Sequence, residues 1–182
     1  MTGLTLAERI LAIEAALSGV PHAFGGALAL AYYADPRATI DIDLNVFVPA
    51  ERFEAVAAPL DRLGADAGTP SVADLVSRDG QVRVIWDSTP IDLFFSYDRF
   101  HDAAGAARWS VPFGSGTIPI LAAEHLIVCK VVYNRPKDWV DIDAMLAAGA
   151  DVDAAEVLRW VGRLTGDDDP RYNRVVAVLT RR

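Results

Sequence analysis

The fold is decided by one stretch of ten residues, Thr39-Ile40-Asp41-Ile42-Asp43-Leu44-Asn45-Val46-Phe47-Val48. Its even-numbered positions are all apolar, and this period of two is typical of a β-strand with one face in a protein core. The opposite face carries Asp41 and Asp43. The stretch therefore predicts a strand over residues 39–48 that presents two carboxylates from the same side.

A glycine turn precedes this strand. The residues His22-Ala23-Phe24 predict a short strand, Gly25-Gly26 predict a sharp turn, and the alanine-rich stretch to Tyr33 predicts a helix. Backbone N–H groups in the first turn of a helix attract anions, and the helix dipole adds to that attraction. The glycine turn is therefore a candidate phosphate-binding site.

A third acidic residue, Asp92, opens an apolar stretch that predicts a strand over residues 91–96. Residues 81–86 predict a second strand, and the polar residues 87–90 predict the turn of a hairpin between the two. A charge inside such a strand either lies exposed at an edge or serves a site. If the strand lies beside residues 39–48, Asp92 approaches the same face and could deprotonate or orient an attacking hydroxyl.

The spacing of Asp41 and Asp43 places their backbones about 6–7 Å apart on one face. Two carboxylates this close raise each other's pKa unless a cation compensates them. Oxygen ligands suit hard cations, so the pair predicts Mg²⁺ or Mn²⁺, with Asp92 completing the set of acids. The alternative interpretation is a solvated sheet edge, since strands with two outward polar residues are common.

Two groups of motifs resemble the signature of the nucleotidyltransferase superfamily, especially its AbiEii-like, toxin-like branch of minimal nucleotidyltransferases. The first group is Gly25-Gly26 followed by Arg37-x-Thr39-x-Asp41-x-Asp43. The second is Lys130 followed by Arg135-x-x-Asp138-x-x-Asp141, which resembles the lysine helix of that branch and the segment after it. The similarity spans roughly residues 22–147.

The resemblance implies metal-dependent transfer of a nucleoside monophosphate from a nucleoside triphosphate (NTP) to an acceptor hydroxyl, with pyrophosphate leaving. It implies that Asp41, Asp43 and Asp92 are catalytic and bind the metal. The residues implied to bind the nucleotide are Gly25, Gly26, Arg37, Thr39, Lys130, Arg135 and Asp138. The acceptor stays open between a tRNA, a protein and a small molecule, and the toxin-like branch adds a cognate antitoxin as a candidate partner.

Three of these residues also have structural interpretations. Lys130 has mostly apolar helical neighbours, so it either reaches a phosphate or extends its ammonium to solvent. Pro136 suits the first position of a helix, so Asp138 either stabilises that helix end or pairs with Lys130 or Arg37. Arg135 is either a surface residue or a phosphate contact.

The predicted elements indicate an α+β fold, a nucleotidyltransferase-like small mixed sheet flanked by helices. Other expected helices cover residues 5–17 and residues 49–63, and the chain from Leu121 onward is mostly helical with a break at Arg135-Pro136. We expect residues 1–120 to form the nucleotidyltransferase-like core and residues 121–182 a helical part packed on it, together one compact unit.

Composition excludes several classes of protein. The formal net charge of −8 argues against broad DNA binding, which depends on Lys and Arg neutralising phosphates. The chain has one cysteine, so an intrachain disulfide is impossible, and hydrophobic residues at 52% are enough for a core. With no basic-then-apolar leader and no apolar run of about 18 residues, we expect a cytoplasmic protein without membrane contact.

Two rival functions remain open from the sequence. Haloacid dehalogenase-like phosphatases also use an Asp-x-Asp after an apolar strand, and Gly166-Asp167-Asp168-Asp169 superficially supplies their later acidic segment. No strand is predicted before that segment. The second rival is a catalytically inactive nucleotidyltransferase-fold protein that binds a partner, because fold alone never guarantees activity.

Overall fold

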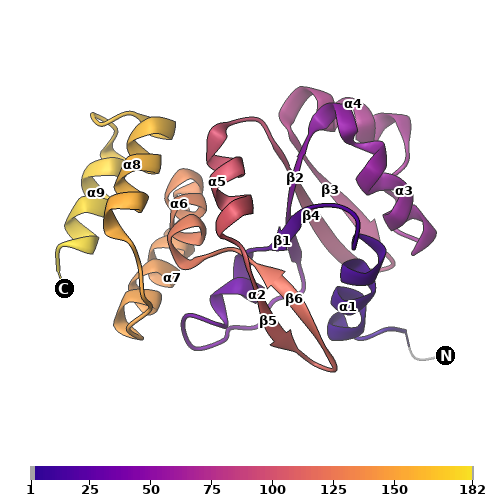
Figure 1. Cartoon of the computed structure of the whole chain (residues 1–182), viewed down its shortest axis with the longest axis horizontal. Coiled ribbons are helices and arrows are strands. Elements are labelled where there is room, and N and C mark those ends of the chain that lie inside the picture. Colours follow the sequence, from indigo (N-terminus) through magenta and orange to yellow (C-terminus); the bar gives the residue numbers. More distant parts are fainter. Residues whose placement is uncertain (1–2, 182) are drawn as a thin grey trace. The chain divides into compact units, whose positions relative to one another are not determined.

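The computed structural model describes residues 3–181, which form two compact units. The first unit comprises the chain as far as Leu28 together with Ala38–Leu121. The second comprises Ala29–Arg37 together with the chain from Ala122 onward. Figure 1 labels the helices and strands of both units.

The first unit contains a six-stranded mixed sheet with the order β3-β4-β2-β1-β6-β5. Neighbours β3/β4, β2/β1 and β6/β5 are antiparallel, whereas β4/β2 and β1/β6 are parallel. The strands are β1 (His22–Phe24), β2 (Ile42–Pro49), β3 (Gln81–Trp86), β4 (Thr89–Ser96), β5 (Trp109–Phe113) and β6 (Gly116–Ile120). This mixed sheet confirms the predicted fold class.

Helices of the first unit complete its core. They are α1 (Leu6–Ala16), the 3-10 helix η1 (Ala50–Arg52), α3 (Glu54–Arg62), α4 (Pro70–Asp79) and α5 (Arg99–Ala107). The even-numbered side chains of β2 from Ile42 to Val48 are buried, and Phe95 of β4 meets Phe53 next to α3 at 6.0 Å between ring centroids. On the opposite face, α5 contacts β2, where Gly105 leaves room for the ring of Phe47.

The second unit is helical. Its main helices are α6 (Ala123–Tyr133), α7 (Pro136–Ala147), α8 (Ala154–Thr165) and α9 (Pro170–Leu179), and α6 contacts the other three. Prolines at the first helical position open α7 and α9, where a missing N–H costs nothing. The short helix α2 (Gly26–Leu30) runs from the first unit into the second.

Several predicted elements need correction. The strand predicted from Thr39 begins at Ile42, where its pairing with β4 begins opposite Ile91, and Ile40 before it is 72% exposed. The helix predicted over residues 49–63 is divided into η1 and α3. The sequence did not predict α4, α5 or the β5–β6 hairpin. None of the helices within residues 3–181 combines the length and apolar character that a membrane span requires.

Candidate active site

The three predicted acids lie on one side of the sheet of the first unit. In the parallel pairing of β2 with β4, Asp43 is the register partner of Asp92. Partners in neighbouring strands project from the same face, with backbones about 4.8 Å apart. Asp41 precedes the first residue of β2 and is two positions from Asp43, so the three acids form a row, which we call the acid row.

The glycine turn lies against the acid row. The Gly25 N–H donates to the backbone oxygen of Asp43 at 2.9 Å. Gly26 has a φ of +52°, and a Cβ built on it would lie 1.7 Å from Oδ2 of Asp43. A Cβ on Gly25 would lie 2.8 Å from Nδ2 of Asn45. Gly26 therefore requires glycine, because its φ is positive and the Asp43 carboxylate occupies the space where a side chain would begin. At Gly25 a side chain would have to displace the amide of Asn45.

Thr39 shapes the entry to β2. Its hydroxyl donates to the backbone oxygen of Asp41 and accepts from the N–H of Asp41, both at 3.2 Å. These local bonds order the residues that no neighbouring strand supports. The structure thus gives Thr39 a role in positioning Asp41.

Arg83 of β3 is a member of the site that the sequence did not predict. It is the antiparallel register partner of Asp92, and its Nε and Nη2 each donate to that carboxylate at 2.7 Å. Its Nη2 also lies 3.6 Å from Oδ2 of Asp41. The hydrogen bonds with Asp92 raise the pKa of the Arg83 guanidinium above its usual value. Arg83 is therefore a cation placed among the acids.

The donor set of the acid row suits a divalent cation only in part. Carboxylate oxygens are the ligands that Mg²⁺ prefers, and Asp41 and Asp43 share a face. Within residues 3–181, however, no three Asp, Glu, His or Cys side chains come close enough together to hold one ion. The carboxylate of Asp92 is engaged by Arg83. A metal could meet the Asp41/Asp43 pair directly, but Asp92 would first have to turn from its arginine.

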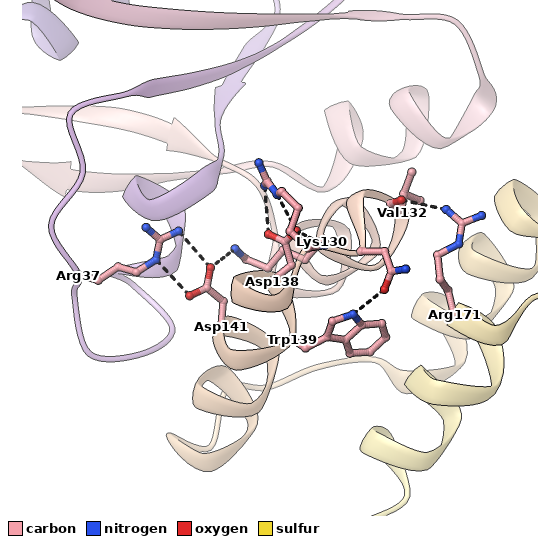
Figure 2. A network of polar contacts seen from close by, with 9 residues as sticks. Arg37, Lys130, Val132, Asp138, Trp139, Asp141 and Arg171 are labelled. Atoms are coloured by element: carbon pink, nitrogen blue, oxygen red, sulfur yellow. Dashed lines mark hydrogen bonds and ion pairs between the residues drawn. The ribbon is translucent and has the colours of Figure 1, made fainter.

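A second cluster of charges lies wholly within the second unit (Figure 2). Asp141 accepts from Lys130 Nζ at 2.6 Å and from Nε and Nη2 of Arg37 at 3.1 Å each. Lys130 and Asp141 are both buried. Burial would raise the pKa of Asp141, but the bonds from Arg37 and Lys130 outweigh it and leave that pKa below its usual value. Asp141 therefore holds both cations in place as a carboxylate.

Asp138 has a different partner from those considered in the sequence. Its side chain is fully buried and accepts from the backbone N–H, Nε and Nη2 of Arg135 at 3.0, 2.8 and 3.1 Å. The pair forms a capping box at the start of α7. Asp138 thus pairs with Arg135 rather than with Lys130 or Arg37, and the carboxylate that contacts those two cations is Asp141.

The corner between α6 and α7 is fixed by its own contacts (Figure 2). Asn134 ends α6 in the left-handed conformation, with a φ of +55°, and its Oδ1 accepts from Trp139 Nε1 at 2.7 Å. Arg171 of α9 donates to the backbone oxygen of Val132 at 2.9 Å. The guanidinium of Arg174 lies 4.0 Å from the ring centroid of Trp139. Arg171 and Arg174 of α9 thus both contact this corner.

The predicted site residues therefore fall into two groups. Those of the first unit gather at the acid row: Gly25, Gly26, Thr39, Asp41, Asp43 and Asp92. Those of the second unit form the charge clusters of α6 and α7: Arg37, Lys130, Arg135 and Asp138. Sequence reasoning missed Arg83, although a turn of two residues at Asp87-Ser88 would have placed it opposite Asp92.

Mixed sheet topology, a glycine turn and an acid row together define the class of nucleotidyltransferases. A family model described as the nucleotidyl transferase AbiEii toxin of type IV toxin–antitoxin (TA) systems matches residues 9–179. The chain belongs to this AbiEii nucleotidyltransferase family. No curated protein sequence matches the chain.

Solved structures show the same fold. The solution structure of the antibiotic-resistance factor ANT(2'')-Ia has a TM-score of 0.63 at 18% identity and covers 97% of each chain. The crystal structure of ANT(2'')-Ia with adenylyl-2''-tobramycin gives 0.57 at 16%, covering 98% of this chain and 99% of that one. An antigenic nucleotidyltransferase-like protein from Paracoccidioides brasiliensis gives 0.50 at 16%, covering 94% and 84%.

The fold also removes one rival function. The segment Gly166-Asp167-Asp168-Asp169 connects α8 to α9, so the element directly before it is a helix and not a strand. The sheet around β2 is mixed, with β1 antiparallel to it. These features, with the family match, exclude the haloacid dehalogenase-like interpretation.

Proposed function

We propose that the chain transfers a nucleoside monophosphate from an NTP to an acceptor hydroxyl in a metal-dependent reaction at the acid row. The observation that carries this proposal is the register of Asp43 with Asp92 beside Gly26. Membership of the AbiEii family supports the transfer of a nucleoside monophosphate. Mg²⁺, or Mn²⁺ in its place, is the proposed cofactor because the donors are all carboxylates.

Each acid has a proposed role. Asp41 and Asp43 would hold the metal, which polarises the phosphoryl oxygens and neutralises charge on the leaving pyrophosphate. Asp92 would complete the metal site and accept the proton of the acceptor hydroxyl. The acceptor oxygen forms a bond to the α-phosphorus while the bond from that phosphorus to the bridging oxygen of the β-phosphate breaks.

The glycine turn would receive the triphosphate. With no side chains on Gly25 and Gly26, backbone N–H groups can approach phosphate oxygens closely, and the following residue is Ala27 rather than a hydroxyl donor. Contacts to the nucleotide from Arg37, Lys130, Arg135 and Asp138 stay predictions, as does that of Thr39. The ion pairs of Arg37, Lys130 and Arg135–Asp138 already give these charged residues a structural role.

The family description supports a proposal for the partner, and one solved relative supports a proposal for the class of acceptor. The family description names a toxin of a type IV TA system, so we propose a toxin whose activity is opposed by a cognate antitoxin in the cytoplasm. One solved relative holds adenylyl-2''-tobramycin, which is why a small-molecule hydroxyl stands beside tRNA and protein among the candidate acceptors.

The proposal is tested by label transfer. Purified protein is incubated with Mg²⁺, each α-labelled NTP in turn, and total tRNA, a cell-protein extract or an aminoglycoside. We expect transfer of label to one acceptor class. Asp43→Asn should reduce this transfer at least a hundredfold, since the metal pair is broken.

The matched control for this assay is Asp74→Asn. Asp74 is an exposed carboxylate on α4 of the same unit and lies outside the acid row, so transfer should be unchanged. Label transfer that survives Asp43→Asn would refute the proposed site. Metal-dependent NTP binding without transfer to any acceptor would instead favour the inactive, partner-binding role.

A further inference from the structure

Arg83 presents a physical problem for a metal site. It spans the acid row, with two hydrogen bonds of 2.7 Å to Asp92 and an ion pair of 3.6 Å to Asp41. A bidentate arginine–carboxylate pair is among the stronger polar contacts in proteins. While it persists, both oxygens of Asp92 are occupied by N–H donors and are poorly placed to bind a cation.

The electrostatics point the same way. A guanidinium and a divalent cation that share a carboxylate repel each other, because like charges held a few ångströms apart near a protein surface are only partly screened. The Arg83 side chain is 52% exposed on β3, so it has room to swing away from the acids. The guanidinium and the metal are thus alternative counter-ions for the same carboxylates.

We propose that Arg83 is a built-in counter-ion that competes with the divalent metal for Asp92 and Asp41. This inference rests on the proposed metal-dependent function. Without metal, Arg83 balances the charge of the acid row and holds Asp92 in place. Metal binding must displace it, so the chain binds metal more weakly than its carboxylates alone would.

The test measures metal affinity directly, without nucleotide or acceptor. Mn²⁺ binding to the full chain is followed by electron paramagnetic resonance of the free ion, for wild type, Arg83→Met and Asp43→Asn. We expect Arg83→Met to bind Mn²⁺ about tenfold more tightly than wild type, equivalent to about 1.4 kcal/mol. Asp43→Asn should abolish that binding, which would assign the measured ion to the acid row.

The control is Arg78→Met, which removes the same charge from the same unit. Arg78 is 70% exposed and pairs with Asp79, so its loss should leave Mn²⁺ affinity within about twofold of wild type. A second variant, Arg83→Gln, repeats the measurement with a polar side chain should Arg83→Met prove unstable. Damage to the fold could weaken binding but could not tighten it.

The outcomes separate this inference from the proposed function. Equal or weaker Mn²⁺ binding by both Arg83 variants would overturn the counter-ion role while leaving the metal site intact. Failure of every protein to bind Mn²⁺ would overturn both. Tighter binding by the variants without any label transfer would support the counter-ion role and count against the catalytic proposal.

Discussion

Gly26 is constrained twice, by its positive φ of +52° and by the Asp43 carboxylate 1.7 Å from where a Cβ would lie. Gly26→Ala should therefore lower the free energy of unfolding by about 2–4 kcal/mol, through backbone strain and a displaced carboxylate. Urea denaturation measures the loss. Mn²⁺ affinity should fall with it, because Asp43 is pushed from its position.

Gly149 supplies the matched control for that substitution. It also has a positive φ, of +79°, but nothing lies within 4 Å of a Cβ built on it. Gly149→Ala should show only the strain of the left-handed backbone, about 1 kcal/mol. If the two alanine variants lose equal stability, crowding of a Cβ at position 26 against the Asp43 carboxylate does not contribute to the loss.

Asp141 makes the free energy of unfolding depend on pH in acidic solution. Its pKa in the folded chain lies below the usual value of 3.8, so the carboxylate contributes its full stabilisation above that value. The contribution disappears as pH falls through the folded pKa. Asp141→Asn should cost about 3 kcal/mol at pH 7, because Lys130 stays buried without its carboxylate. The difference from wild type should shrink towards zero below the folded pKa.

Urea denaturation of the two proteins between pH 7 and pH 2 checks this dependence. Asp143→Asn is the control, since Asp143 lies on the same helix but is exposed. It should stay within about 0.5 kcal/mol of wild type at every pH. A loss of stability in Asp141→Asn that is constant across the whole pH range would show that the ion pairs of Asp141 do not stabilise the fold.

Single residues were predictable where one local pattern decides them. The alternation of β2 placed Asp41 and Asp43 on one face, and the glycine turn needed only its two glycines. Arg83 was not predictable in the same way, because its role depends on the register of β3 with β4, and the turn was predicted two residues too long. For Asp138, the capping box within its own helix prevailed over the longer-range pairing.

At the scale of elements, the corner between α6 and α7 is held by Asn134. Asn134→Gly keeps the left-handed conformation but loses the bond to Trp139, so it should lower the free energy of unfolding by up to about 1 kcal/mol. Asn134→Ala loses the bond to Trp139 and also strains the left-handed backbone, so it should lower the free energy of unfolding by about 2 kcal/mol. Thermal and urea denaturation of the pair provide the measurement. Equal losses would show that backbone conformation does not contribute here.

Elements were predictable when their pattern was regular. α1 begins at the expected Thr5 cap, and the α6–α7 break lies at Pro136 as expected. The β5–β6 hairpin was missed because its glycines and prolines suggest a loop, although Ile118 is buried in the sheet. α4 was missed for a similar reason, since Thr69-Pro70 caps a helix start but also reads as a turn.

At the scale of the whole molecule, the order of the predicted helices and strands indicated the class of fold, but not the division of the chain into two compact units. The segment Ala29–Arg37 belongs with the C-terminal helices, since Arg37 pairs with Asp141. That contact joins residues far apart in sequence, and no periodicity indicates it. The net charge of −8 is likewise compatible with a locally charge-balanced site, where Arg83 faces the acids.

The parallel pairing of β1 with β6 has a consequence for synthesis of the chain. Phe24 pairs with Ile120, and the Leu121 N–H donates to the Phe24 oxygen at 3.0 Å. The edge of β1 that faces β6 therefore has no hydrogen-bonding neighbour until β6, near the end of the first unit, has left the ribosome. The nascent chain would expose this unpaired strand edge from the synthesis of β1 until β6 emerges, so chaperone binding during that interval would guard against mispairing between chains.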